Sequence, residues 1–195
     1  MSPMPADTTF SPDDLGYALR EALAFTEAAP GTGVAPAAAP TVFALIPTDV
    51  LAQAAPGAVA EGDESVLSLL AEDPLPVAED AEPLAALEQF LATASWPEPV
   101  VGAAVVTEIV LLSPQASADL PASEASADEI AAAALRRAAH EHPDAQRARV
   151  AVGALRGGRT LALLEVEVSG GERELRTHPE LALDLQRALG AALAD

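Results

Sequence analysis

The sequence predicts an α+β fold: a single domain with a mainly antiparallel sheet of about five strands and with helices packed chiefly on one face. Three observations support it. Helical periodicity occurs near both ends of the chain, a Gly-Gly pair separates two alternating apolar segments, and residues 100–112 form a long β-branched stretch. At 195 residues the chain has the length of one domain.

The first helix is expected to begin at Ser11, because a hydroxyl cap is followed there by Pro12 and two acids. Apolar residues at helical spacing carry it to about Ala28. Residues 1–10 and the Pro/Ala/Gly-rich residues 29–40 lack such a pattern. We therefore expect a mobile tail at 1–10, a mobile loop at 29–40, and one domain over 11–195.

The middle of the chain predicts a strand at 41–47, a short helix from Thr48 through Gln53, and a helix that starts near Pro83. Between Glu61 and Glu82 lie eight acids and no base. Their spacing lacks the glycine-centred pattern of a calcium loop, so a solvated face is expected. The strand at 100–112 is apolar on both faces, which is typical of the centre of a sheet.

Two capping boxes are read in the last third of the chain, at Ser126 with Glu129 and at Thr177 with Glu180, each opening a helix. Between these helices, Gly157 and Gly158 predict a two-residue hairpin turn. That turn would place Leu155 opposite Thr160 and would bring two arginines, Arg156 and Arg159, face to face.

The net charge of -20 is concentrated in the first part of the chain. Residues 1–135 carry 21 acids and one arginine, whereas residues 136–195 carry nine of each. Such a field repels phosphate backbones and anionic lipid, so no nucleic-acid partner is expected. Lysine and asparagine are absent, which fits either a GC-rich genome or a halophile's acidic surface.

The start of the chain lacks the basic and apolar regions of a secretory signal. The longest apolar block is also shorter than the roughly 18 residues needed to span a bilayer. We therefore expect a cytoplasmic protein without membrane insertion.

Catalytic and metal-binding signals are scarce. Without cysteine or lysine there is no thiol nucleophile, Schiff-base lysine or P-loop lysine. His140 and His142 stand two residues apart, about 200° around a helix, which does not suit a shared metal. We expect no catalytic residue, no metal and no cofactor, and hence a protein that is not an enzyme.

Four residues stand out as candidate site residues. Arg156 and Arg159, side by side at the turn, require a counter-charge, which we expect acids of the first part of the same chain to supply. The alternative is an acidic partner or a small anion. Glu108 lies inside an apolar strand and would serve either as an acid or base or as the partner of an arginine. Trp96, between prolines, is expected to close the core edge between a helix and the long strand.

Four segments together resemble a family of uncharacterised actinobacterial proteins of about 200 residues: TVFALIPT, LEQFLATASWPEPVVGAAVVTEIVLL, HPDAQRARVAVGALRGGRTLALL and HPELALDLQRAL. The resemblance covers roughly residues 12–194. The family has no assigned activity, so it implies no site residues. The order of elements is also similar to that of the small acidic chaperones of secretion systems, which often dimerise, but fold does not fix function.

The leading expectation for function is a non-enzymatic protein-binding or regulatory domain, chaperone-like or adaptor-like, with a protein partner and a possible homodimeric state. The alternative is a small-ligand binder or enzyme that uses Glu108 and arginines. A deep pocket converging on Glu108 would favour the alternative. A shallow, partly apolar exposed face would favour protein binding.

Overall fold

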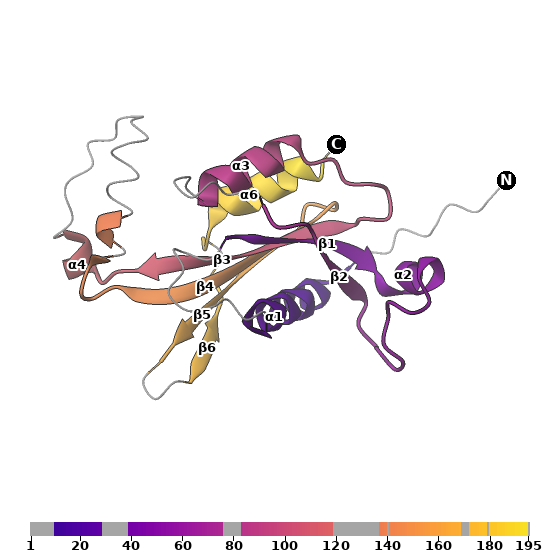
Figure 1. Cartoon of the computed structure of the whole chain (residues 1–195), viewed down its shortest axis with the longest axis horizontal. Helices are drawn as coiled ribbons and strands as arrows, with labels where there is room; N and C mark the ends of the chain where they lie inside the picture. The colour runs from indigo at the N-terminus through magenta and orange to yellow at the C-terminus, as the bar shows by residue number, and fades with distance from the viewer. Residues whose placement is uncertain are drawn as a thin grey trace.

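The computed structural model describes residues 10–28, 39–75, 83–118, 137–139, 141–168, 172–178 and 180–194, with side chains of the third range from residue 86. Its centre is a six-stranded antiparallel sheet in the order β2-β1-β3-β4-β5-β6 (Figure 1). The strands are β1 (Thr41–Pro47), β2 (Leu67–Ala71), β3 (Gly102–Leu111), β4 (Gln146–Leu155), β5 (Thr160–Glu167) and β6 (Arg173–Arg176). The helices are α1 (Pro12–Ala28), α2 (Thr48–Ala54), α3 (Pro83–Thr93), α4 (Pro114–Ala118) and α6 (Leu183–Ala192).

The α+β class is confirmed, but two details of the prediction were wrong. The sheet has six strands and not about five. The helices do not gather chiefly on one face, because α1 covers one face while α3 and α6 lie on the other (Figure 1). The reason is that β3 and β4 are apolar on both sides, so each face needs a cover to bury it.

Helix α1 begins as expected. The Ser11 hydroxyl accepts a hydrogen bond from the Asp14 amide at 3.1 Å, and the Asp14 carboxylate accepts one from the Ser11 amide at 2.7 Å. These reciprocal bonds form a capping box. The Ser11 hydroxyl also donates to the Asp14 carboxylate at 2.7 Å, and this bond first and the Ser11 amide bond second hold the pKa of Asp14 below its usual value.

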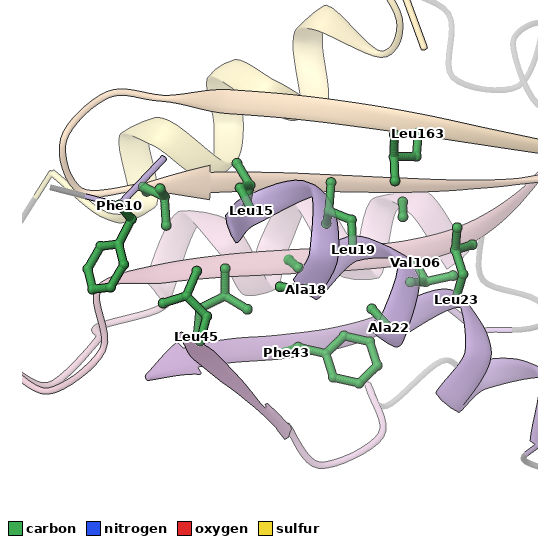
Figure 2. Close-up of a cluster of buried hydrophobic side chains, with 14 residues drawn as sticks. Phe10, Leu15, Ala18, Leu19, Ala22, Leu23, Phe43, Leu45, Val106 and Leu163 are labelled. Atoms are coloured by element: carbon green, nitrogen blue, oxygen red, sulfur yellow. The ribbon is translucent and has the colours of Figure 1, made fainter. Parts of the chain in front are cut away.

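The buried stripe of α1 packs on the sheet, as Figure 2 shows for Leu15, Leu19 and Leu23 above Phe43 and Val106. Gly153 of β4 lies directly beneath the helix. A Cβ atom there would come within 2.9 Å of Leu15 and 3.0 Å of Leu19, so the glycine permits this close approach.

On the opposite face α6 packs over β4 and β5 and is flanked by α3 (Figure 1). The predicted capping box at Thr177 and Glu180 was wrong. The Thr177 hydroxyl instead donates to the Ala162 carbonyl of β5 at 2.9 Å, and α6 starts at Leu183 after Ala182 in a left-handed conformation. Tertiary bonding to β5 therefore outweighs the local capping pattern.

The β4–β5 hairpin forms at the predicted place in a different register. Leu155 pairs with Arg159, since the Leu155 amide donates to the Arg159 carbonyl at 2.8 Å, and the loop has three residues. Gly158 adopts φ +81°, the left-handed position that this loop requires. Thr160 thus lies opposite Ala154, and Arg156 is in the loop and not facing Arg159.

Several predictions concern residues that the structure does not describe. Residues 1–9 of the predicted tail, residues 29–38 of the predicted loop, the capping box at Ser126 and the side chain of His140 lie outside the described residues. The last residue of that tail, Phe10, is described, and its ring is buried beside α1 (Figure 2).

Candidate functional site

A groove of about 400 Å³ opens on the face of the sheet that carries α3 and α6. It lies between strands β2 and β1, at one edge of the sheet, and the end of α3 with the loop that follows. Its lining comprises Ala44, Ile46, Leu70 and Glu72 from the strands, and Phe90, Ala94, Ser95, Trp96, Pro97 and Val100 from the helical side. We call it the Trp96 groove.

The groove exists because the helices of this face do not reach the β2 edge of the sheet. Val42 of β1 contributes to the core under α3 and α6, and Ala44 and Ile46 point to the same side by the alternation of a strand. Leu70 lies directly opposite Ala44 on β2 and is 38% exposed. An apolar strand pair is therefore left open beside the helix.

Trp96 forms one wall of the groove. Its half-buried ring packs against the core below α3 and meets Phe90 edge to face, with ring centroids 6.2 Å apart. This is the core-edge position, between a helix and the long strand, that the sequence indicated. The buried indole nitrogen Nε1 has no hydrogen-bond partner in the described part of the chain.

Arg156 stabilises the same wall through hydrogen bonds to its backbone. Its guanidinium donates to three carbonyl oxygens: Val100 at 2.8 Å, Leu193 at 2.9 Å and Trp96 at 2.8 Å. The expectation that acids of the first part meet this side chain was wrong for Arg156, because backbone carbonyls at chain ends and bends also need donors. Arg159 is exposed, and no described residue forms an ion pair with it.

Glu108 lies on the other face of the sheet, beyond the end of α1. Its register partner on β4 is Arg149, which forms an ion pair with Glu165 of β5. Arg149 also donates to the Leu23 carbonyl at 3.0 Å and to the Thr26 hydroxyl at 3.2 Å, and so fastens the end of α1. Glu108 thus faces an arginine, as one of the two interpretations of the sequence proposed.

A second hollow, of about 210 Å³, surrounds this charged row. Its charged lining residues are Glu108, Arg147, Arg149, Glu165, Glu167 and Arg173. The charges of the three arginines and three glutamates cancel. Glu165 forms ion pairs with both Arg149 and Arg173. The structure thus separates Glu108 and Trp96 onto opposite faces and does not join them in one site.

No group of three or more His, Asp or Glu side chains is arranged to hold a metal ion within the described ranges. The ring of His142 accepts a hydrogen bond from the Asp144 amide at 3.1 Å, within its own turn. Among the helices that the structure describes, none is both long and apolar enough to cross a membrane.

Of the two strands that line the groove, β1 was predicted from the sequence and β2 was missed. Residues 61–82 were interpreted only as an acidic solvated face, yet Leu67–Ala71 within them form β2. The available signal was the short apolar run VLSLL between two acidic clusters, which is typical of a brief strand.

Comparisons with known proteins bear on family alone. The family model described as PPA1309-like protein matches residues 20–194. No curated protein and no solved structure matches the chain.

Proposed function

The chain belongs to the PPA1309-like protein family, which is uncharacterised, and from this premise we propose that it is a non-enzymatic protein-binding domain whose partner docks in the Trp96 groove. The observation that carries the proposal is the groove itself: an open apolar surface framed by a tryptophan and an uncovered pair of strands. Apolar hollows of several hundred Å³ are typical of binding sites.

Exposed side chains around β2 support a macromolecular partner. Leu70 is 38% exposed and Val66, just before the strand, is 47% exposed. Large apolar side chains gathered at one edge are more typical of a protein contact than of a monomer's solvated surface. A tryptophan wall is also typical of the anchor positions of protein interfaces.

The finer parts of the proposal are a chaperone-like or adaptor-like role, a cytoplasmic location and an actinobacterial origin. Composition supports them: the chain has no cysteine and no lysine, and its net charge of -20 disfavours nucleic acid and anionic lipid as partners. A second copy of the chain is an alternative occupant of the groove, which light scattering would detect as a dimer.

One observation favours a second candidate function. The hollow around Glu108 brings three arginines and three glutamates together, as a small-ligand site or an active site would. The ion pairs of Glu165 with Arg149 and Arg173 favour a structural role there. If Glu108→Gln abolished the binding of a small ligand while leaving groove binding intact, this candidate would replace the first.

The proposed function is tested by selecting peptides from a random display library on the immobilised protein. We expect enrichment of apolar-containing peptides on the parent, and its loss on Leu70→Ser. The matched control is Leu175→Ser on β6, which removes an equally large side chain that is 44% exposed at the opposite edge. If the parent enriches no peptide, or if all three proteins enrich the same peptides, the proposal fails.

A further inference from the structure

We infer that the segment bound at the Trp96 groove is an extended chain of apolar and basic residues that adds to the sheet as a seventh strand beside β2. This inference rests on the proposed function and specifies the partner's chemistry and its mode of binding. Three features carry it: the free backbone of β2, the position of the groove along that strand, and the charge of its surroundings.

Within the described ranges, the backbone of β2 is open on its outer side. The Glu72 amide donates to the Val42 carbonyl at 2.9 Å and the Thr48 amide donates to the Val66 carbonyl at 3.1 Å, so the even-numbered residues bond to β1. By the alternation of an antiparallel ladder, the N–H and C=O groups of Leu67, Leu69 and Ala71 point outward. No described residue bonds to them across that edge.

The two edges of the sheet differ in how they resist pairing. All four residues of the β6 edge, Arg173–Arg176, are exposed, and three of them are charged. Charged edge strands are a common protection against the addition of another strand. The β2 edge, Leu67–Ala71, carries no charge at all. The unprotected edge is therefore the one that borders the groove.

A strand beside β2 would place alternate side chains in the groove. Leu70 and Glu72 project from β2 into the hollow, and cross-strand neighbours on one face of a sheet lie in contact. Apolar side chains of the added strand would thus lie beside Leu70 and extend the apolar lining. Its other side chains would face the side of α1.

The charge of the site selects a basic partner. Asp63 and Glu64 precede β2, and Glu72 and Asp73 follow it. All residues that line the groove belong to the segment 41–100, whose sequence contains eleven acids and no arginine, lysine or histidine. The nearest described cation at the Trp96 wall is Arg156, whose donors already bind three carbonyls.

The acidic field extends to the α1 side of β2. Burial of Glu21 on α1 and, second, the nearby charge of Asp63 raise the pKa of that glutamate. Basic side chains on this side of an added strand would relieve the repulsion between the two carboxylates. Electrostatic complementarity of this kind gives both a faster association rate and specificity.

The test uses an acetylated and amidated peptide of alternating valine and arginine, about eight residues long, which matches the length of a typical strand. The chain has one tryptophan, so the fluorescence of Trp96 reports directly on the groove. We expect the peptide to shift the Trp96 emission and to bind more weakly as salt is raised. The same peptide with glutamate in place of arginine should not bind.

Two changes test strand addition. The first change is N-methylation of the valine-arginine peptide at alternate residues. Two peptides are prepared, one methylated at the valines and one at the arginines, because either set of amides would face β2. The second is Ala71→Pro, which removes an outward N–H group without breaking the β1 ladder. Loss of affinity of about tenfold or more is expected with Ala71→Pro and with one of the two methylated peptides.

The control is Leu175→Pro, the same change at the corresponding outward position of β6, which should bind the peptide like the parent. Strand addition is overturned if both methylated peptides bind the parent protein as tightly as the unmethylated peptide does, and if Ala71→Pro binds the unmethylated peptide as tightly as the parent does. The Leu70→Ser result then decides separately whether the groove binds protein at all. If the glutamate peptide binds equally well, or if the valine-arginine peptide fails to bind at millimolar concentration, the inference is also overturned.

Discussion

Arg156 donates a hydrogen bond of 2.8 Å to the carbonyl oxygen of Trp96, across 60 positions of sequence. Through its other donors it also holds the carbonyls of Val100 and of Leu193, just past the end of α6. One side chain of the β4–β5 loop therefore joins the groove wall, the start of β3 and the C-terminal helix. All three partners are neutral, so this bracing does not depend on an ion pair.

Replacing Arg156 by glutamine should destabilise the protein by about 2 kcal/mol, because three carbonyls lose a charged donor at a partly exposed site. The loss should be similar at low and high salt, since carbonyl acceptors carry no net charge. Urea denaturation followed by Trp96 fluorescence measures both quantities. Arg159→Gln is the control and should stay within about 0.5 kcal/mol of the parent. Equal losses for the two variants would contradict the bracing role.

Trp96→Phe should be nearly neutral, within about 1 kcal/mol, because the loss of ring area is offset by removal of a buried, unpaired N–H group. Trp96→Ala should cost about 3 kcal/mol, since it also removes the edge-to-face contact with Phe90. Denaturation must be followed by circular dichroism, because both variants lack the fluorophore. A large loss in the phenylalanine variant would indicate that the indole nitrogen has a partner in solution.

The parts of the fold that were predictable are those decided by local chemistry. The cap at Ser11, the apolar stripe that follows it and the doubly apolar strand β3 all lie where the sequence placed them. In each case the residues that form the element also carry the signal. The same holds for Trp96, whose position follows from the end of a helix next to a long strand.

The hairpin register was not predictable, because β5 gives no preference between its two faces. Leu161 through Leu164 are apolar without interruption, so a shift by one residue keeps an apolar pattern on both sides. The choice depends on the loop, where Gly158 adopts the left-handed conformation and adds one residue. The groove was equally hidden, since it arises from how far α3 and α6 extend and from the pairing of β2 with β1.

The loop geometry predicts different effects at two adjacent glycines. Gly158→Ala should destabilise the protein by about 1 kcal/mol, because its φ of +81° is unfavourable for any residue with a Cβ atom. Gly157→Ala should have little effect, since nothing lies within 4 Å of an added Cβ atom there. Thermal denaturation of both variants measures the difference. A two-residue turn of type I′, by contrast, would require positive φ at Gly157 as well and would penalise both substitutions.

Glu165→Gln should destabilise the protein by about 2 kcal/mol. This loss is smaller than that expected when one partner is removed from a fully buried ion pair, because Glu108 still faces Arg149 in the variant. The side chains of Arg149 and Glu165 are 17% and 13% exposed. Glu174→Gln is the control, because its ion pair with Arg176 is more than half exposed and should contribute nothing measurable. Chemical denaturation of the two variants tests this order.

The capping box of α1 predicts a specific pH dependence. Hydrogen bonds from Ser11 hold the pKa of Asp14 below its ordinary value of 3.8, so the folded state favours the ionised carboxylate. That contribution to stability is present above the unfolded pKa and is lost as the pH falls through the lower folded value. Ser11→Ala should therefore cost about 1 kcal/mol at neutral pH, the usual worth of such a cap.

The cost of Ser11→Ala should decrease as the pH drops below the ordinary pKa of Asp14, because protonation removes the charged acceptor in the parent too. Urea denaturation of the variant and the parent at matched pH values measures this difference and cancels the contribution of the other acids. Asp14→Asn provides the control, since it lacks the titrating group and its remaining cap should be insensitive to pH over this range. A cost of Ser11→Ala that stays constant or grows on acidification would show that the hydroxyl stabilises α1 without the carboxylate.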